Sequence, residues 1–98
     1  MRKRIEVLSL ISARRDKIKK YGVTSLALFG SCAREEGTAA SDLDFVVELK
    51  EKTFDAYMDL KFYLEELFGV PVDLVPANTI KPRLRKRILD EAIHVPGF

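Results

Sequence analysis

The sequence predicts an α/β (α+β) fold in which helices cover a mixed sheet of three or four strands. Two observations predict it. Short apolar runs rich in β-branched residues alternate with longer amphipathic stretches, and glycine or a charged break ends most of these segments. The expected order is helix, strand, short helix, strand, helix, strand, helix. The 98 residues leave room for one modest core, so we expect a single domain over 1–98.

Apolar residues at helical spacing predict three amphipathic helices, over 2–21, 54–68 and 80–92. Thr53 is the expected N-cap of the second helix, because its hydroxyl can accept from a free backbone N–H of the first turn. Gly22 and Gly69 are expected to end the first and second helices. A further one or two helical turns are expected within 31–36.

Three apolar runs predict strands, over 23–29, 43–49 and 70–75. Pro71 stands near the start of the third run, where a missing N–H is tolerated. We expect a loop over 37–41, a turn over 76–79 and a short extended tail over 93–95.

The composition excludes several classes of protein. Hydrophobic residues make up 47% and charged residues 33% of the chain, which is typical of a soluble globular protein and argues against disorder. No apolar run approaches the ~18 residues of a membrane-spanning helix, and no cleavage site follows the basic start of the chain. The single cysteine, Cys32, cannot form an internal disulfide. We therefore expect a cytoplasmic protein with no membrane partner.

The charge distribution does not point to nucleic acid. The net charge is +2 and the pI is about 8.8, which is only mildly basic. Basic residues cluster at 2–4, 14–20 and 81–87, where solvated helix faces are the ordinary explanation. Because no aromatic stacking platform accompanies the cluster at 81–87, nucleic acid is not expected as a partner.

Three aspartates are expected to meet at one end of the sheet. Asp42 and Asp44 flank Leu43 at the start of the second strand, and side chains two apart on a strand point to the same face. Asp73 interrupts the apolar third strand, where a lone buried carboxylate would be costly. If the third strand lies beside the second, the three carboxylates converge.

Converging carboxylates indicate a divalent cation. At about 4 Å and an effective dielectric near 20, each pair of such charges repels by about 4 kcal/mol. Mg²⁺ prefers oxygen ligands and shares substrate phosphates, and two such ions can clamp the attacking and leaving oxygens of a phosphoryl transfer. Taken alone, the Asp-x-Asp pattern also fits a surface pair, or a turn cap formed by Asp42 after Ser41.

Gly30 and Ser31 follow the first strand and open the short helix, a place where backbone N–H groups can cradle phosphate. Gly30 would allow close backbone approach, and the Ser31 hydroxyl could bond a phosphate oxygen. An ordinary turn with an N-cap is the commoner meaning of Gly-Ser by itself.

Together, residues 30–44 read Gly-Ser-Cys-Ala-Arg-Glu-Glu-Gly-Thr-Ala-Ala-Ser-Asp-Leu-Asp. This segment resembles the GS-x-AR-x-E…SD-x-D signature of the minimal nucleotidyltransferases of the DNA polymerase β-like superfamily, most closely the MntA-type antitoxins. Asp73 supplies the third carboxylate on the next strand, so the resemblance covers essentially the whole chain. It implies the small nucleotidyltransferase fold.

The resemblance also implies a role for each residue of the motif. Asp42, Asp44 and Asp73 would hold Mg²⁺, as two ions, and Asp73 would also serve as general base. The triphosphate would be bound by three residues at the start of the motif, Gly30, Ser31 and Arg34. Related sequences often place glycine before the glutamate that follows the arginine. Here two acids follow Arg34 directly, which leaves the roles of Glu35 and Glu36 open.

The activity implied is Mg²⁺-dependent transfer of AMP, or another nucleoside monophosphate, from a nucleoside triphosphate such as ATP to a hydroxyl. The implied acceptor is a tyrosine of a HEPN-domain (HepT-type) toxin, which makes the chain the antitoxin of a toxin–antitoxin pair. The alternatives are transfer to a small molecule or an RNA end, for which the chain is short, and a non-catalytic antitoxin that masks its partner by binding. A mask needs no metal ligands. Homo- or hetero-oligomers stay open.

Four further side chains are expected to be structural. Cys32 is expected to pack under the phosphate loop, since no base motif accompanies it. His94 lies outside the motif and is expected at the surface or at a sheet edge. Tyr57 and Tyr63 are expected to serve packing.

Overall fold

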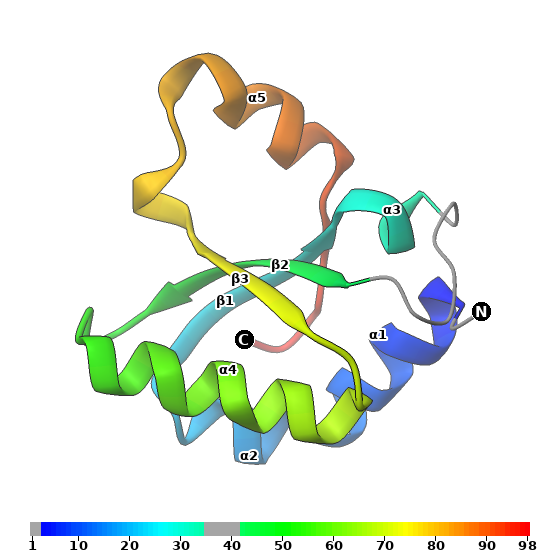
Figure 1. The fold of residues 1–98 in the computed structure, drawn as a ribbon, viewed down its shortest axis with the longest axis vertical. Coiled ribbons are helices and arrows are strands. Elements are labelled where there is room, and N and C mark those ends of the chain that lie inside the picture. Colours follow the sequence, from blue (N-terminus) through cyan, green and yellow to red (C-terminus); the bar gives the residue numbers. More distant parts are fainter. Residues whose placement is uncertain (1–2, 35–41) are drawn as a thin grey trace.

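The computed structural model describes residues 3–34 and 42–98, which form a four-stranded mixed sheet with helices on both faces (Figure 1). The predicted fold class is confirmed. The helical elements are α1 (Arg4–Ala13), α2 (Arg15–Lys19), α3 (Gly30–Ala33), α4 (Phe54–Phe68), the 3-10 turn η1 (Ala77–Thr79) and α5 (Pro82–Glu91). The strands are β1 (Val23–Phe29), β2 (Leu43–Leu49), β3 (Val72–Pro76) and β4 (Ile93–His94).

The strands lie in the order β3-β2-β1-β4. β1 pairs antiparallel with β2 and with β4, whereas β2 pairs parallel with β3. A parallel pair needs a crossover connection, and α4 supplies it between β2 and β3. The register sets Asp44 opposite Phe29 on one neighbour and opposite Asp73 on the other. The start of β2 is therefore the meeting point of all three strands.

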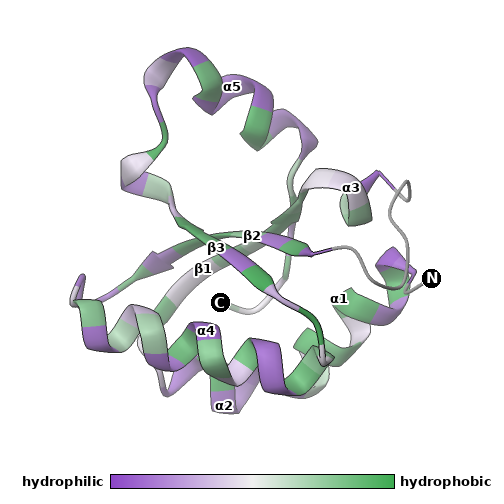
Figure 2. Ribbon diagram, viewed as in Figure 1, coloured by the Kyte–Doolittle hydropathy of each residue, from purple (hydrophilic) through white to green (hydrophobic). Residues whose placement is uncertain are grey.

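One face of the sheet carries the main core. Alternate residues of β2 point toward α1, α2 and α4, and all of these β2 side chains are buried: Leu43, Phe45, Val47 and Leu49. Phe45 stacks against Phe68 of α4, with 6.1 Å between the ring centroids. Burying each of these rings stabilises the fold by roughly 1.5–3 kcal/mol. Figure 2 shows the alternation of polar and apolar residues along α4 that directs its apolar stripe to the sheet.

The opposite face of the sheet is covered more thinly. Val46, Ala77 and Ile80 form a small buried cluster there, with Ile88 of α5 packed partly against it. No residue of α5 is fully buried, and this helix lies on the side of the sheet opposite α4 (Figure 1). Because the side chains of Asp44 and Asp73 belong to this face, they are accessible from the side that α5 frames.

The prediction of one continuous helix over 2–21 is wrong, because the structure has two helices there, α1 and α2. Arg14 leaves helical geometry (φ −107°, ψ 13°), and its N–H is shared between the carbonyls of Leu10 and Ile11. No apolar residue between Ala13 and Ile18 ties this stretch to the core. The chain bends there, and Ile18 in α2 is fully buried.

The third strand and the last helix begin or end a few residues away from their predicted bounds. The third strand begins after Pro71, whose carbonyl accepts from the N–H of Leu43, and it continues to Pro76. The last helix starts at Pro82, since Lys81 before it is held extended (φ −61°, ψ 138°), as a residue preceding proline usually is. Thr53 caps α4 as predicted, with its hydroxyl accepting from the N–H of Ala56 at 3.2 Å.

Within residues 3–34 and 42–98, no helix is both long and apolar enough to cross a membrane. That 1–98 form one whole domain stays a prediction.

Candidate active site

Asp44 and Asp73 occupy paired positions on adjacent parallel strands. Strands so paired lie about 4.8 Å apart, which brings the two carboxylates onto one face of the sheet. The expectation that the third strand lies beside the second is confirmed. The expectation that Asp73 is buried was wrong: its side chain is exposed, because β3 is an edge strand and this side of it faces away from the core.

Asp42 directly precedes β2 and its side chain is exposed. Its charge is near enough to Asp44 to affect the titration of that carboxyl. Burial raises the pKa of Asp44 above the ordinary 3.8, and the charges of Asp73 and then Asp42 raise it further, while the nearby Arg34 lowers it. The three predicted aspartates therefore share one electrostatic neighbourhood, in which negative charge is only partly balanced.

Gly30 lies directly against Asp44. It has a positive φ of 77°, a conformation that glycine adopts without the cost other residues incur. A Cβ added there would lie 2.9 Å from Cγ of Asp44 and closer still to a carboxylate oxygen. Gly30 was expected to let the backbone approach a phosphate; the structure adds a second requirement, room for the Asp44 carboxylate.

The one-turn helix α3 is held from two sides. Arg4 of α1 donates from Nη1 to the carbonyl of Ala33 at 3.0 Å. On the other side, Arg34 Nη1 lies 3.3 Å from Glu91 Oε2 of α5. Ser31, the second residue of α3, is partly exposed beside these contacts. The segment that carries the proposed phosphate-binding residues is thus tied to both α1 and α5.

Arg4 and Glu91 are residues that the sequence analysis missed. Their partners are 29 and 57 residues away along the chain, and no motif or spacing connects them. β3 is held in a similar way by α4. The hydroxyl of Tyr57 donates to the carbonyl of Leu74 at 2.7 Å, so Tyr57 serves hydrogen bonding as well as packing.

Some predicted residues lie outside the described part of the chain. Glu35, Glu36 and the possible turn at Ser41 fall there. Among the residues that the structure describes, no three His, Cys, Asp or Glu side chains are grouped closely enough to hold a metal ion as they stand. Cys32 is buried and His94 is exposed on the edge strand β4, both as predicted.

The sequence profile of the nucleotidyltransferase domain matches residues 10–95, most of the chain and all of the carboxylate site. The chain belongs to this family. It is therefore a nucleotidyltransferase, an enzyme class that typically uses a divalent metal.

This nucleotidyltransferase is similar to named protein adenylyltransferases. A predicted protein adenylyltransferase of Methanocaldococcus jannaschii is 44% identical over 80 residues, covering 78% of this chain and 80% of the relative. The protein adenylyltransferase MntA of Thermococcus cleftensis is 33% identical over 92 residues, covering 92% of this chain and 93% of the relative.

Solved structures share the fold. The solved structure of a protein described as a minimal nucleotidyltransferase superposes with a TM-score of 0.73 at 40% identity, covering 88% of this chain and 93% of that one. A toxin–antitoxin complex with AMP-PNP matches with a TM-score of 0.71 at 20% identity, over 88% and 73% of the two chains. A complex of a tri-AMPylated HEPN toxin of Shewanella oneidensis with an MNT antitoxin matches at 0.66 and 19%, over 93% and 73%. At these lower identities the two complexes establish the fold alone.

Proposed function

We propose that this nucleotidyltransferase moves AMP from ATP to a hydroxyl of another protein, a tyrosine of a HEPN-domain toxin, and so acts as the antitoxin of the pair. The observation that carries the proposal is the pairing of Asp44 with Asp73, with Gly30 directly against the Asp44 carboxylate. The adenylyltransferase names of the relatives and the HEPN partners of the structural neighbours support the choice of nucleotide and acceptor.

The donor set suits a hard divalent cation. Asp42, Asp44 and Asp73 are carboxylates, which Mg²⁺ prefers, and the raised pKa of Asp44, caused by burial and by the two other acids, reflects negative charge that a cation would balance. As they lie in the described part of the chain, these side chains do not form a complete metal-binding site by themselves. That arrangement suits Mg²⁺, which is usually held by one or two carboxylates together with substrate phosphates. When bound, the ion would neutralise charge that develops on the phosphoryl oxygens.

The protein's own residues would orient the triphosphate. The backbone N–H groups at Gly30 and the start of α3 would donate to a phosphate, and the Ser31 hydroxyl can donate to a phosphate oxygen. Arg34 adds a positive charge on the same side, held at 3.3 Å by Glu91. These groups would fix the β- and γ-phosphates so that the α-phosphorus lies over the aspartates.

The reaction is a displacement at the α-phosphorus. The acceptor hydroxyl oxygen forms a bond to that phosphorus, the bond from phosphorus to the oxygen bridging to the β-phosphate breaks, and pyrophosphate leaves with that electron pair. The hydroxyl proton passes to the carboxylate of Asp73, which is exposed and therefore accessible to an incoming side chain. No redox change is involved.

The acceptor is proposed to arrive on a folded partner. The described residues are used for the four strands and the helices beside them, and the exposed Asp73 and partly exposed Asp44 lie on the face of the sheet that carries α5. A protein docking over that face could present a tyrosine to Asp73, whereas a small acceptor would find few side chains to hold it.

The test is incubation with ATP labelled at the α-phosphate, Mg²⁺ and a HEPN-domain protein from the same organism. We expect the partner to gain mass in whole AMP units on tyrosine, and the Asp44→Asn variant to add none. A partner that is silenced in a tight complex without gaining mass would contradict the proposal and establish masking instead. Label transferred only to an RNA end or a small molecule would contradict the choice of acceptor.

A further inference from the structure

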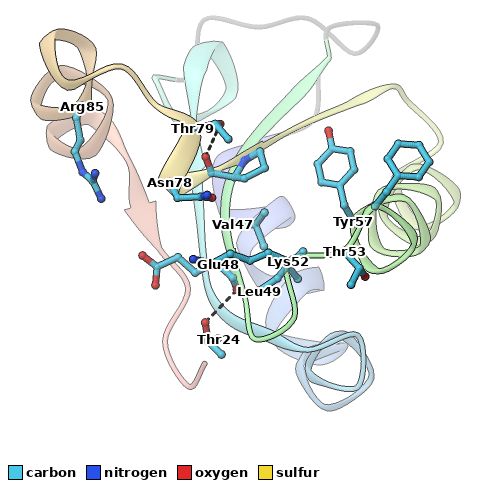
Figure 3. Close-up of a pocket in the computed structure, with 12 residues that line it drawn as sticks. Thr24, Val47, Glu48, Leu49, Lys52, Thr53, Tyr57, Asn78, Thr79 and Arg85 are labelled. Atoms are coloured by element: carbon cyan, nitrogen blue, oxygen red, sulfur yellow. Dashed lines mark hydrogen bonds between the residues drawn. The ribbon is translucent and has the colours of Figure 1, made fainter.

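A cavity lies at the edge of the sheet where β3 ends. Pairing between β2 and β3 stops at Val47 and Pro76, but β2 continues to Leu49. The uncovered end of β2 forms the floor of a cavity of about 650 Å³ between the start of α4, η1 and α5. Figure 3 shows this β3-end cavity with Arg85 of α5 on one side and Tyr57 of α4 on the other.

The β3-end cavity is separate from the carboxylate site. None of the three aspartates lines it, and neither does Gly30 or Ser31. Glu48, which does line it, is four residues beyond Asp44 on β2, about 13 Å away at 3.3 Å per residue. A ligand in the cavity would therefore not compete directly for the aspartates.

One wall of the cavity is aromatic. Phe54 lines it with 74% of its surface exposed, which is unusual for so large an apolar side chain. Tyr57 lies one turn along α4, and its ring is held in place because its hydroxyl donates to the carbonyl of Leu74. Two rings beside an open cavity suit a planar ring of a ligand, since stacking would cover apolar surface that water now contacts.

The cavity also carries positive charge. Lys52 and Arg85 line it, against one acid, Glu48, giving a net charge of +1 among the lining residues. Within the described part of the chain, neither cation takes part in an ion pair. Asn78 adds an amide that can both donate and accept. The lining therefore favours a ligand that combines negative charge with hydrogen-bonding groups.

The volume falls within the roughly 300–1,000 Å³ of sites that bind small molecules. We propose that the β3-end cavity binds a small anion with a planar ring, of the nucleotide class, independently of the aspartates. This inference goes beyond the proposed transfer reaction and does not depend on it.

The experiment is a titration of the ¹⁵N-labelled protein with AMP in EDTA, followed by NMR. Without a divalent cation the carboxylates disfavour phosphate near Asp44, so binding at the cavity is isolated. We expect saturable shifts at the amides of 52–57 and of Arg85. Adenosine, which lacks the charge, and inorganic phosphate, which lacks the ring, should each bind at least about 10-fold more weakly than AMP. Absence of shifts, shifts confined to 30–34 and 42–44, or equal affinity for phosphate alone would overturn the proposal.

Variants locate the binding. Lys52→Gln and Arg85→Gln should each weaken AMP binding about 5-fold or more, and Phe54→Ala should weaken it as well. All three side chains are exposed, so the fold should be retained. Lys86→Gln is the matched control, since Lys86 is a cation on the same helix that does not line the cavity. If Lys86→Gln weakened AMP binding equally, the overall positive charge of α5 would explain the binding, and the proposal would be overturned. Because the assay contains neither Mg²⁺ nor acceptor, its failure would leave the transfer reaction untouched.

Discussion

The backbone of Gly30 lies so close to the carboxylate of Asp44 that a Cβ on residue 30 would be 2.9 Å from Asp44 Cγ. The glycine that opens α3 and the aspartate of β2 are therefore one structural unit. Any side chain at residue 30 must displace the carboxylate proposed to bind the metal, as well as adopt a backbone conformation that strains it.

The first prediction concerns Gly30→Ala. We expect it to abolish nucleotidyl transfer, because the new methyl group moves Asp44, while lowering the free energy of unfolding by only about 1–2 kcal/mol, the cost of a left-handed backbone in a non-glycine residue. Denaturant unfolding and labelled-ATP transfer measure the two effects.

Gly69→Ala is the control for that prediction. Gly69 has nearly the same backbone conformation (φ 70°), but nothing lies within 4 Å of an added Cβ. It should lose similar stability and retain transfer. If both variants lose transfer in the same proportion as stability, the contact between Gly30 and Asp44 has no special role.

The second prediction concerns Asp44→Asn and pH. The folded Asp44 keeps its proton at pH values where the unfolded chain has lost it, because its pKa is raised above 3.8, chiefly by burial and then by Asp73 and Asp42. In this pH range the folded state binds more protons than the unfolded state. The contribution of Asp44 to the free energy of unfolding therefore falls as the pH rises from 3.8 through the raised pKa of the folded state. Asn should therefore stabilise the apo protein at pH 7, by less than about 1 kcal/mol because the group is only partly buried.

Urea unfolding at several pH values checks this sign. The advantage of Asp44→Asn over the natural protein should shrink as the pH falls through the raised pKa of Asp44 toward its ordinary 3.8, because the natural carboxyl then takes up its proton. Asp59→Asn, at an exposed position on α4, supplies the comparison for a carboxylate distant from the site. If the stability gain of Asp44→Asn grew as the pH falls, the raised pKa of Asp44 could not be its cause.

How much of this site could be predicted from sequence depended on the range of the interactions. The strands at 23–29 and 43–49 were predicted with the bounds observed, because glycine and a charged break mark their ends locally. The meeting of Asp44 with Asp73 could be stated only as a condition, since it needs the strand order. The exposure of Asp73 was missed because an apolar run does not reveal that its strand lies at the edge of the sheet.

Contacts across the fold were beyond sequence reasoning. The pair of Arg34 with Glu91 joins α3 to α5 across 57 residues, and both partners resemble ordinary surface charges in the sequence. The break at Arg14 was missed for a related reason. The periodicity of apolar residues continues across it, and only the local backbone geometry shows that the helix stops.

The third prediction is that a nucleotide bound at the three aspartates stabilises the fold only when Mg²⁺ balances their charge. Mg²⁺ with a non-hydrolysable ATP analogue should raise the melting temperature, by an amount equivalent to about 2.7 kcal/mol when the free analogue is at 100 times its Kd. The analogue in EDTA should raise it much less, by no more than binding at the β3-end cavity contributes, because the three aspartates then repel the phosphates. Asp44→Asn and Asp73→Asn should reduce the Mg²⁺-dependent part. Calorimetry would contradict the proposed metal site if Mg²⁺ made no difference to the shift.

The fourth prediction concerns how a partner reaches the site. α5 carries four cations, and Lys81 directly before it adds a fifth. The helix lies on the side of the sheet opposite α4 (Figure 1), the side to which Asp44 and Asp73 belong. Such a surface attracts an acidic partner and accelerates its encounter more than it strengthens the final complex. Arg83→Glu with Arg87→Glu should therefore slow labelling of the HEPN-domain partner several-fold at low salt. The difference should fade toward 1 M salt, where the screening length falls from about 10 Å at 0.1 M to about 3 Å.

Lys19→Glu with Lys20→Glu provides the matched control for this charge reversal. Both lysines are exposed at the end of α2, on the face of the sheet opposite α5 (Figure 1), so the net charge changes equally but away from the face that carries the aspartates. Initial labelling rates across a salt series would separate the two variants. If the α2 reversal slows labelling as much as the α5 reversal, the effect comes from total charge, and α5 does not guide docking. If neither slows it, the partner approaches without electrostatic steering, and the cations of α5 form an ordinary solvated surface.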